Sequence, residues 1–305
     1  MHVFVAGGTG VLGRRLVPRL VGRGHKVTAT TTSAAKLGLL SSVGAHGVVM
    51  DGLDGTSVGE AVGRAQPDVI VHQMTAMAGK PDIKHMDRWF AVTNRLRTEG
   101  TDHLLAAAEA LGLEHFVAQG YANWNGIREG SWVKTEEDPT DPMLGTSAAS
   151  GMAAIRHAED AVVAAGGAVL RYGGLYGPGA TDDHVELIRK RLFPLVGSGG
   201  GYSSWVHLDD AVSATVLAVE LRVRGVFNIV DDDPAPASDW LPYLAQCAGM
   251  KRPMRVPVWL ARLLAGPVAV AMMTEGRGFS NRKAKRDLGW ELRYPSWRQG
   301  FQEDL

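Results

Sequence analysis

The fold of this chain is decided by its first thirteen residues, MHVFVAGGTGVLG (1–13). The apolar run at 3–5 predicts a strand, and Gly7, Gly10 and Gly13 follow it in the spacing of a dinucleotide-binding turn. Gly7 permits a tight turn, Gly10 lets a pyrophosphate approach the backbone, and Gly13 lets the next helix pack on the strand. The anion would lie on free amides at the helix N-terminus. We therefore expect nucleotide binding rather than a purely structural turn, with cofactor contacts from Gly7, Thr9, Gly10, Val11, Leu12 and Gly13.

The composition narrows the class of protein. The chain has 305 residues, of which 45% are hydrophobic and 38 are glycine, which is typical of a soluble α/β protein with a large core. Lysine plus arginine equals aspartate plus glutamate at 32 each, so no basic field predicts a nucleic acid or a membrane as a partner. Cys247 is the single cysteine, which excludes an internal disulfide and a cysteine metal cluster. We expect a small-molecule partner and a cytoplasmic location.

Two further segments suggest special sites but have simpler explanations. Residues 256–273 are apolar, yet Arg262 and Gly266 interrupt them, so we predict two helices packed on the core rather than a membrane span. The three aspartates at 231–233 resemble metal ligands, but adjacent carboxylates before a proline are more typical of a solvated cap. We predict no bound metal. Residues 1–20 are accounted for by the first strand, turn and helix, so no signal peptide is expected.

Strand and helix patterns alternate along the chain. The predicted strands are 26–32, 47–50, 68–72, 114–119, 168–172 and 225–230, and the predicted helices include 83–111, 148–164, 237–248 and 281–288. This alternation predicts a Rossmann-type doubly wound parallel sheet with helices on both faces. We expect a dinucleotide-binding domain over residues 1–180, to which 202–230 add, and a mainly helical substrate lobe over 181–305. Asp209 or Asp210 is expected to cap the helix that begins near them.

The end of the second predicted strand bears on the choice of cofactor. An NAD-selective site of this type places Asp or Glu about twenty residues past the glycines, where this chain has only hydroxyl residues at 30–33. Lys36 and the pair Arg14-Arg15 add positive charge, so we expect NADP, with NAD as the alternative, and contacts from Thr32, Ser33 and Lys36. Solvated helix faces would explain these cations equally well.

Polar residues end two other predicted strands, where the ligand crevice of such a sheet lies. The Asp51 carboxylate, followed by Gly52, could accept a hydrogen bond from adenine or could simply belong to a turn. His72 could be a catalytic base, although a lone histidine closing an apolar strand is more often a core residue.

Together these motifs resemble the extended short-chain dehydrogenases/reductases of the NAD-dependent epimerase/dehydratase type. The resemblance covers nearly the whole chain and is carried by residues 7–13, 51–54, 68–72, 170–179, 205–210, 227–234 and 288–290. It implies that Met74, Thr75 and Ala76 border the cofactor and that residues 173–175 lie at the nicotinamide. Gln119, Tyr172, Gly174 and Leu175 complete the cofactor contacts that we expect.

The catalytic triad of that family does not carry over. The family uses a Ser or Thr after the fifth strand and then Tyr-x-x-x-Lys on the next helix. Alignment on Gly126 places Tyr121 at the Ser/Thr position, and alignment on Glu159 places Gly151 and Ile155 at the Tyr and Lys positions. Residues 124–165 contain no tyrosine, and their single lysine is in the predicted loop. The proton for a carbonyl must therefore come from the substrate, from Tyr121 or from water.

The chain also resembles a triad-lacking subset of the family found in actinobacterial natural-product pathways, such as the angucyclinone ketoreductase of simocyclinone biosynthesis. That resemblance implies an NAD(P)H-dependent ketoreductase acting on a carbonyl of a polycyclic aromatic polyketide, whose own phenol could supply the proton. The residues expected to contact this aromatic ketone are Met77, Tyr121, Trp124 and Tyr176, although ordinary core packing would explain each of them singly.

Two other functions stay open at this point. One is a catalytically silent NADP-binding redox sensor, and the other is a sugar-nucleotide epimerase or dehydratase, which would need the missing tyrosine base. The chain is expected to be a monomer or a homodimer.

Overall fold

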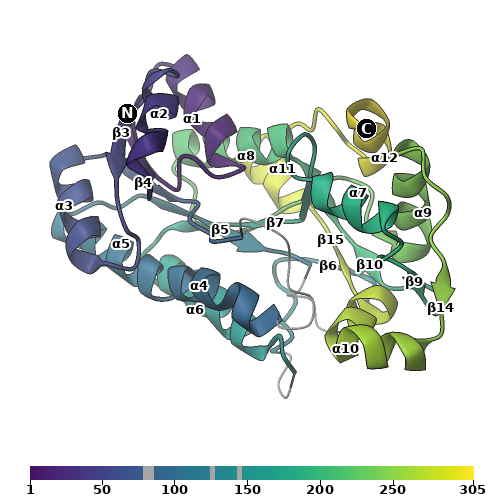
Figure 1. Cartoon of the computed structure of the whole chain (residues 1–305). Coiled ribbons are helices and arrows are strands. Elements are labelled where there is room, and N and C mark those ends of the chain that lie inside the picture. Colours follow the sequence, from purple (N-terminus) through teal and green to yellow (C-terminus); the bar gives the residue numbers. More distant parts are fainter. Residues whose placement is uncertain (78–85, 124–127, 143–145) are drawn as a thin grey trace.

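The computed structural model describes residues 1–77, 86–123, 128–142 and 146–305, and a parallel sheet forms its centre (Figure 1). The seven strands follow the order β12-β7-β5-β4-β1-β2-β3, and every neighbouring pair is parallel. Their bounds are β1 His2–Ala6, β2 Lys26–Thr31, β3 His46–Val49, β4 Val69–His72, β5 Phe116–Tyr121, β7 Ala168–Tyr172 and β12 Gly225–Ile229. This arrangement confirms the predicted Rossmann-type doubly wound sheet.

Both faces of the sheet are covered because its strands are apolar on both sides. Val3 and Val5 pack toward one face, with α1 (Gly13–Gly22), α8 (Leu208–Leu221) and α11 (Arg282–Leu288). Phe4 and Ala6 pack toward the other face, against the helices α3 (Gly55–Ala65), α4 (Met86–Arg97), α5 (Glu99–Ala110) and α6 (Ala149–Ala164). Figure 1 shows the two helical layers above and below the sheet. The strand order reverses at β1, so the carboxyl ends of β1 and β4 form the crevice in which such sheets bind ligands.

The helix predicted over 83–111 is two helices in the described part of the chain. Thr98 lies between α4 and α5 with φ −93° and ψ −83°, outside the helical region. The break lets α4 pack along α6 while α5 packs against α3. Both helices pack an apolar side on the same face of the sheet. The apolar periodicity of the sequence therefore continues across the break and gives no sign that the helix ends there.

A second, smaller lobe is built from C-terminal helices and short strand pairs. Its helices are α7 Asp182–Arg189, α9 Ala237–Cys247, α10 Val258–Glu275 and α12 Trp297–Asp304. Its strands pair as β8 Gly174–Tyr176 with β11 Trp205–His207, β9 Leu195–Val196 with β14 Arg255–Val256, β10 Tyr202–Ser203 with β13 Ala235–Pro236, and β6 Val133–Lys134 with β15 Gly278–Phe279. The lobe has its own aromatic core, in which Trp205, Trp240 and Phe301 are buried. The remaining elements, η1 Ala34–Lys36 and α2 Leu37–Ser41, follow β2. The proposed boundary at residue 180 stays a prediction, while β12 joins the main sheet.

Helix α10 confirms one part of its prediction and contradicts another. By length and apolar composition alone it is long enough to cross a membrane, with a mean hydropathy of 1.3. Gly266, at φ 81° and ψ 169°, breaks it into two helical parts, which confirms the predicted interruption. The first part is not packed on the core as predicted, because Leu263 is 77% exposed and Trp259 is 69% exposed. Val270 and Met273, in the second part, are buried.

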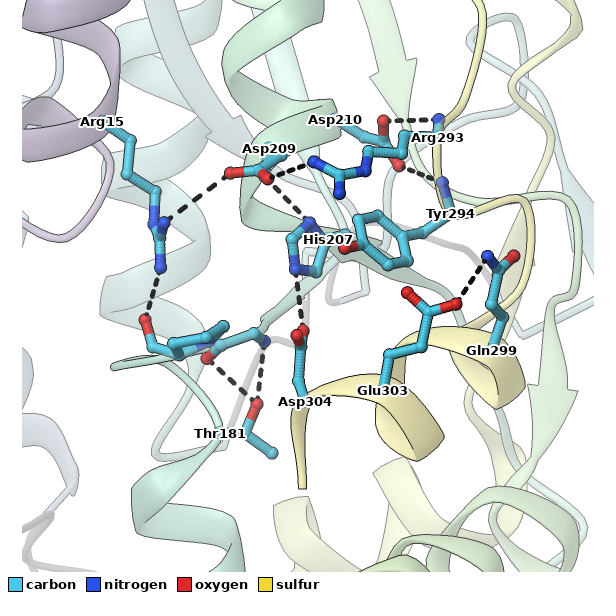
Figure 2. Close-up of polar contacts among 12 residues, drawn as sticks. Arg15, Thr181, His207, Asp209, Asp210, Arg293, Tyr294, Gln299, Glu303 and Asp304 are labelled. Atoms are coloured by element: carbon cyan, nitrogen blue, oxygen red, sulfur yellow. Dashed lines mark hydrogen bonds and ion pairs between the residues drawn. The ribbon is translucent and has the colours of Figure 1, made fainter.

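The predicted cap of α8 is wrong. The cap is His207, whose Nδ1 accepts a hydrogen bond from the Asp209 amide at 3.1 Å (Figure 2). The Asp210 carboxylate instead accepts from the amides of Arg293 and Tyr294, at 2.8 and 2.9 Å. The Asp210 carboxylate therefore makes a tertiary contact instead of capping the helix. Sequence spacing does not reveal such a contact. The residues near 207–210 therefore join α8 to the chain that leads into α12.

The three aspartates at 231–233 each have a structural partner. The Asp231 carboxylate accepts from the Trp297 amide at 2.7 Å, at the start of α12. Asp232 pairs with Lys285, and Asp233 accepts from the Ser296 hydroxyl. The prediction of a solvated cap is wrong for Asp231, which is 1% exposed and holds the start of α12, and the absence of a metal stays a prediction.

Candidate active site

The glycine turn has the shape needed to receive a pyrophosphate. Gly7 has φ +94°, which L side chains rarely adopt. A Cβ on Gly13 would lie 2.3 Å from the Gly7 oxygen, so only glycine lets α1 begin this close to β1. A Cβ on Gly10 would meet a single described atom within 4 Å, the Gly7 oxygen at 3.4 Å, so the space beside Gly10 is open. The amides of residues 11–13 make no hydrogen bond to another described residue. The turn therefore fits a dinucleotide phosphate.

Threonine hydroxyls at the end of β2 hold this turn in place. The Gly7 amide donates to the Thr30 Oγ1 at 3.0 Å, and the Thr9 hydroxyl lies 3.2 Å from that of Thr31. Thr30 and Thr31 are buried, whereas Thr32 beyond them is exposed. Of these hydroxyl residues, Thr30 and Thr31 thus support the turn, and Thr32 lies on the surface.

The positive charges near the turn are less numerous than the sequence suggested. Arg14 and Lys36 are exposed, which both a 2′-phosphate contact and a solvated helix face require, so their role stays a prediction. Arg15 instead pairs with Asp209 at 3.6 Å and donates to the Pro178 oxygen at 2.7 Å (Figure 2). Its charge is therefore directed toward α8 and the loop before α7.

The loops after β3 and β4 meet at the next part of the crevice. The Asp51 Oδ1 accepts from the Leu53 amide at 2.9 Å, which is the turn contact foreseen as the simpler interpretation. A Cβ on Gly52 would lie 2.5 Å from the Met74 sulfur, so glycine is needed for these loops to touch. Met74 is buried, and the adjacent Thr75 and Ala76 are exposed, with the Ala76 amide bound to the Thr93 hydroxyl at 3.0 Å.

His72 is a core residue rather than a base. Its Nδ1 accepts from the Met74 amide at 3.2 Å, and its Nε2 lies 3.3 Å from the Leu96 oxygen. Burial lowers the pKa of His72 to about 4. The imidazole is neutral at pH 7, and both its nitrogens are used to hold the loop that carries Met74.

A cavity of about 280 Å³ lies where the carboxyl ends of β5 and β7 face the smaller lobe. Seven of the predicted site residues line it: Thr75, Met77, Gln119, Tyr121, Tyr172, Gly174 and Leu175. The Gln119 amide donates to the Met74 oxygen at 3.2 Å, which joins this cavity to the cofactor crevice. The Tyr172 hydroxyl lies 2.7 Å from that of Thr215 and accepts from Gln73, so it is held away from proton transfer.

The positions aligned with the family's tyrosine and lysine are buried. Gly151 and Ile155 both lie on the buried side of α6, and Ile155 belongs to an apolar cluster with Ala148 and Met152, against which Tyr121 packs. Glu159, the alignment anchor, forms an ion pair with Arg171 of β7, which fixes the register of α6 on the sheet. Lys134 donates to the Glu129 oxygen at 2.5 Å and is buried in its own loop. Positions 151 and 155 thus carry no hydroxyl or ammonium, and the neighbouring hydroxyl on α6, that of Ser150, is exposed.

Tyr121 is the phenol nearest to the family's Ser/Thr position. Burial raises the pKa of Tyr121, while a hydrogen bond to the Asn123 side chain and the charge of Arg97 act in the opposite direction. Asn123 is itself fixed, because its amide exchanges two 2.9 Å hydrogen bonds with the backbone of Ser204. Tyr121 is therefore positioned at the cavity as a neutral phenol.

One predicted substrate residue, Tyr176, does not line this cavity in the described structure. Tyr176 is fully buried, with its ring 5.1 Å from that of Phe301 and 5.3 Å from that of His207. We therefore place it in the core of the smaller lobe, because β8 turns its side chain toward α12. Trp124 lies outside the described residues, as does the alignment anchor Gly126.

Several cavity residues were not predicted from sequence. Arg97 comes from the end of α4 and His184 from α7, and the other residues are Asn123, Phe193, Ser203, Trp205, Trp240 and Met272. The rings of Trp205 and Trp240 lie 4.9 Å apart, and that of His184 lies 5.7 Å from Trp205. The buried Nδ1 of His184 has no hydrogen-bond partner among the described residues, and burial lowers its pKa. These residues come from helices whose packing over the sheet is not encoded in a local motif.

Comparisons with known proteins agree with this geometry. A model of the NAD dependent epimerase/dehydratase family matches residues 3–229. A 3-diazoavenalumate denitrifying reductase from a Streptomyces species is 41% identical, and the match covers 99% of each chain. A 4-hydroxy-2-methyl-3-oxo-4-farnesyl-3,4-dihydroquinoline-1-oxide ketoreductase from Stigmatella aurantiaca is 26% identical over 87% of this chain and 79% of the relative. The crystal structure of UDP-glucose 4-epimerase from Thermotoga maritima has a TM-score of 0.79 at 20% identity, covering 100% of this chain and 97% of that one, which shows the shared fold.

Proposed function

The chain belongs to the NAD dependent epimerase/dehydratase family and is an NAD-dependent oxidoreductase, and we propose that it reduces an aromatic small molecule without a tyrosine acid. The observation that carries the proposal is that positions 151 and 155 are buried without a proton donor, in a chain whose glycine turn fits a dinucleotide. The cofactor supplies a hydride when it is bound in its reduced form. The protein contributes binding and orientation of an aromatic ring against that position.

The cofactor residues follow from the crevice. The amides of residues 11–13 would hold the pyrophosphate, the loops at Gly52 and Met74 would border the adenosine and ribose side, and residues 173–175 would border the nicotinamide. We propose NADPH as the preferred cofactor because the end of β2 has no carboxylate to bind a ribose 2′-hydroxyl and Lys36 is exposed beside it. We place the enzyme in the cytoplasm, as a monomer or a homodimer.

A diazo substrate suits a site without an acid. When hydride replaces an aryl diazonium group, the carbon–nitrogen bond breaks, N₂ leaves with the bonding electron pair, and a carbon–hydrogen bond forms. The balance is ArN₂⁺ + H⁻ → ArH + N₂, so no oxygen has to be protonated. The relative at 41% identity is named for a denitrifying reduction of a diazo compound. We propose this reaction class first because it requires no proton donor, and positions 151 and 155 provide none.

An aromatic ketone is the second candidate. Its reduction adds a hydride to carbon and a proton to oxygen, and the relative from Stigmatella aurantiaca is named as a ketoreductase. The proton could come from a phenol beside the ketone, as expected for a polycyclic polyketide of the angucyclinone kind, from Tyr121 or from water. General acids of this kind contribute roughly 10²–10⁴-fold to such rates.

The test compares substrates that differ in their need for a proton. Benzenediazonium, 8-hydroxy-1-tetralone and 1-tetralone are each incubated with the protein and deuterium-labelled NADPH, with a protein-free reaction alongside. We expect enzyme-dependent transfer of deuterium to the arene, with release of N₂. Transfer only to 8-hydroxy-1-tetralone would favour the phenolic ketone instead. Absence of transfer to all three, with no binding of NADPH by calorimetry, would overturn the proposal.

A tyrosine variant identifies the source of any proton. Tyr121→Phe should leave diazonium reduction unchanged, and Tyr243→Phe is the control because Tyr243 packs on Trp297 away from the cavity. If Tyr121→Phe slows only the reduction of 1-tetralone, Tyr121 is the acid for ketones. Tight NADPH binding without turnover on any substrate would instead support the redox-sensor hypothesis. A sugar-nucleotide epimerase or dehydratase is disfavoured because positions 151 and 155 offer no base.

A further inference from the structure

Arg97 places a positive charge in the wall of the substrate cavity. It is the last residue of α4, and its side chain lines the cavity together with those of Gln119 and Tyr121. Arg97 is half-buried, and burial lowers its pKa to about 10, with the nearby Tyr121 acting in the opposite direction. The guanidinium is thus still charged at pH 7, although it is largely removed from water.

This charge is not neutralised within the described part of the chain. No described carboxylate lies within ion-pair distance of Arg97, and its hydrogen bond to the Asn94 side chain is long, at 3.5 Å. Arg95, two residues earlier and exposed, pairs with Glu99, and the buried Arg171 pairs with Glu159. A half-buried cation without an ionic partner is unfavourable to the extent that its lost hydration is not replaced.

The rest of the cavity indicates what kind of anion would fit. Phe193, Trp205 and Trp240 form a ring cluster on the lobe side, with centroids 4.9 to 5.8 Å apart. Such a surface accommodates a flat apolar group. The planar guanidinium fork matches the geometry of a carboxylate, to which it can donate two parallel hydrogen bonds.

We propose that Arg97 binds the carboxylate of an aromatic acid and thereby holds the aromatic ring in the cavity for reduction. This assignment rests on the proposed function, because it names the substrate class for that same cavity. A cofactor phosphate is the other anion to consider. The phosphate-binding turn, however, is at the end of β1, whereas Arg97 lies with the residues that border the nicotinamide and the substrate.

The test uses probes that bind but cannot be reduced, so it does not depend on turnover. Calorimetry measures the affinity of 2-naphthoate and of 2-naphthamide for the protein saturated with NADP⁺. The two probes share a shape and differ in charge. For the natural sequence we expect naphthoate to bind at least ten-fold more tightly than naphthamide. This comparison needs no variant, so it stands even if a substitution at 97 prevents folding.

Variants then assign the effect to one side chain. Arg97→Gln should weaken the binding of naphthoate at least ten-fold and change the affinities for naphthamide and NADPH less than three-fold. Arg97→Lys should recover part of the lost naphthoate affinity. Arg95→Gln is the matched control on the same helix and should change neither probe. Equal binding of the two probes, an equal loss of both in Arg97→Gln, or a matching loss of NADPH affinity would each overturn the inference. Carboxylate binding without any turnover would leave the inference standing and count against the proposed function alone.

Discussion

Two alanine substitutions in the glycine turn should separate its role in folding from its role in binding the cofactor. A Cβ at position 13 would lie 2.3 Å from the Gly7 oxygen and 2.7 Å from the Gly8 carbonyl carbon, far inside ordinary contact. Both neighbours are backbone atoms, so we take the upper end of the cost of overpacking, about 3 kcal/mol. Alanine recovers about 1 kcal/mol of helix propensity at the start of α1.

The expected net loss for Gly13→Ala is therefore about 2 kcal/mol, or a fall in melting temperature of roughly 3 °C for a chain of this length. Gly10→Ala should behave differently, because its Cβ meets only the Gly7 oxygen, at 3.4 Å. We expect its melting temperature without cofactor to change by less than about 2 °C. Its Cβ would nevertheless occupy the open space where the pyrophosphate approaches, so NADPH binding should weaken at least ~10-fold, which corresponds to about 1.4 kcal/mol.

Differential scanning calorimetry and isothermal titration with NADPH measure the two effects on the same samples. The natural sequence is the reference for both, and circular dichroism checks that each variant is folded. If Gly10→Ala binds NADPH as tightly as the natural sequence, the phosphate does not approach there. If Gly13→Ala is as stable as the natural sequence, the close approach of the Gly7 oxygen does not restrict position 13 to glycine.

Three further predictions concern charge and pH. Glu159→Gln breaks the buried pair with Arg171 and should cost about 3–5 kcal/mol in urea unfolding; a loss below about 1 kcal/mol would contradict a structural role for the pair. The pKa of His72 falls from an ordinary 6.5 to about 4, so its contribution of about 3 kcal/mol is present above pH 6.5 and lost as the pH falls toward 4. His72→Gln should flatten that part of the stability curve, and an unchanged slope would show that His72 does not titrate as described. Lys36→Ala should weaken the binding of NADPH about 10-fold in isothermal titration and leave the affinity for NADH unchanged. Equal effects on the two affinities would show that Lys36 does not contact the 2′-phosphate.

The cofactor half of the site was predictable because it depends on local backbone geometry. Gly7, Gly10 and Gly13 act through the turn that they form with each other, and three residues in fixed spacing are visible in the sequence. The sheet was predictable for a related reason. Strands such as 3–6 are apolar at every position when helices cover both faces, and such runs are easily recognised.

The substrate half was less predictable because its residues come from separate elements. Arg97 and His184 meet at one cavity only after α4 and α7 have packed on opposite sides of it. Tyr176 has the same aromatic character as Tyr121, yet β8 turns it into the core, and no local pattern distinguishes the two. The predicted cap of α8 was wrong for the same reason. The Asp210 carboxylate accepts hydrogen bonds from the amides of Arg293 and Tyr294, which lie far away in the chain.

The sequence by itself determined the dinucleotide turn and the parallel sheet, since each depends on which residues stand next to one another in the chain. The absence of the Tyr-x-x-x-Lys pair stays a prediction from alignment, and only the tertiary structure decided what surrounds positions 151 and 155. It buries Ile155 in the apolar cluster against which Tyr121 packs, pairs Arg15 with Asp209, and leaves the charge of Arg97 facing the cavity. The physical reason is that the energy of a charge or a phenol depends on its burial and its partners, and both are set by residues far away in sequence.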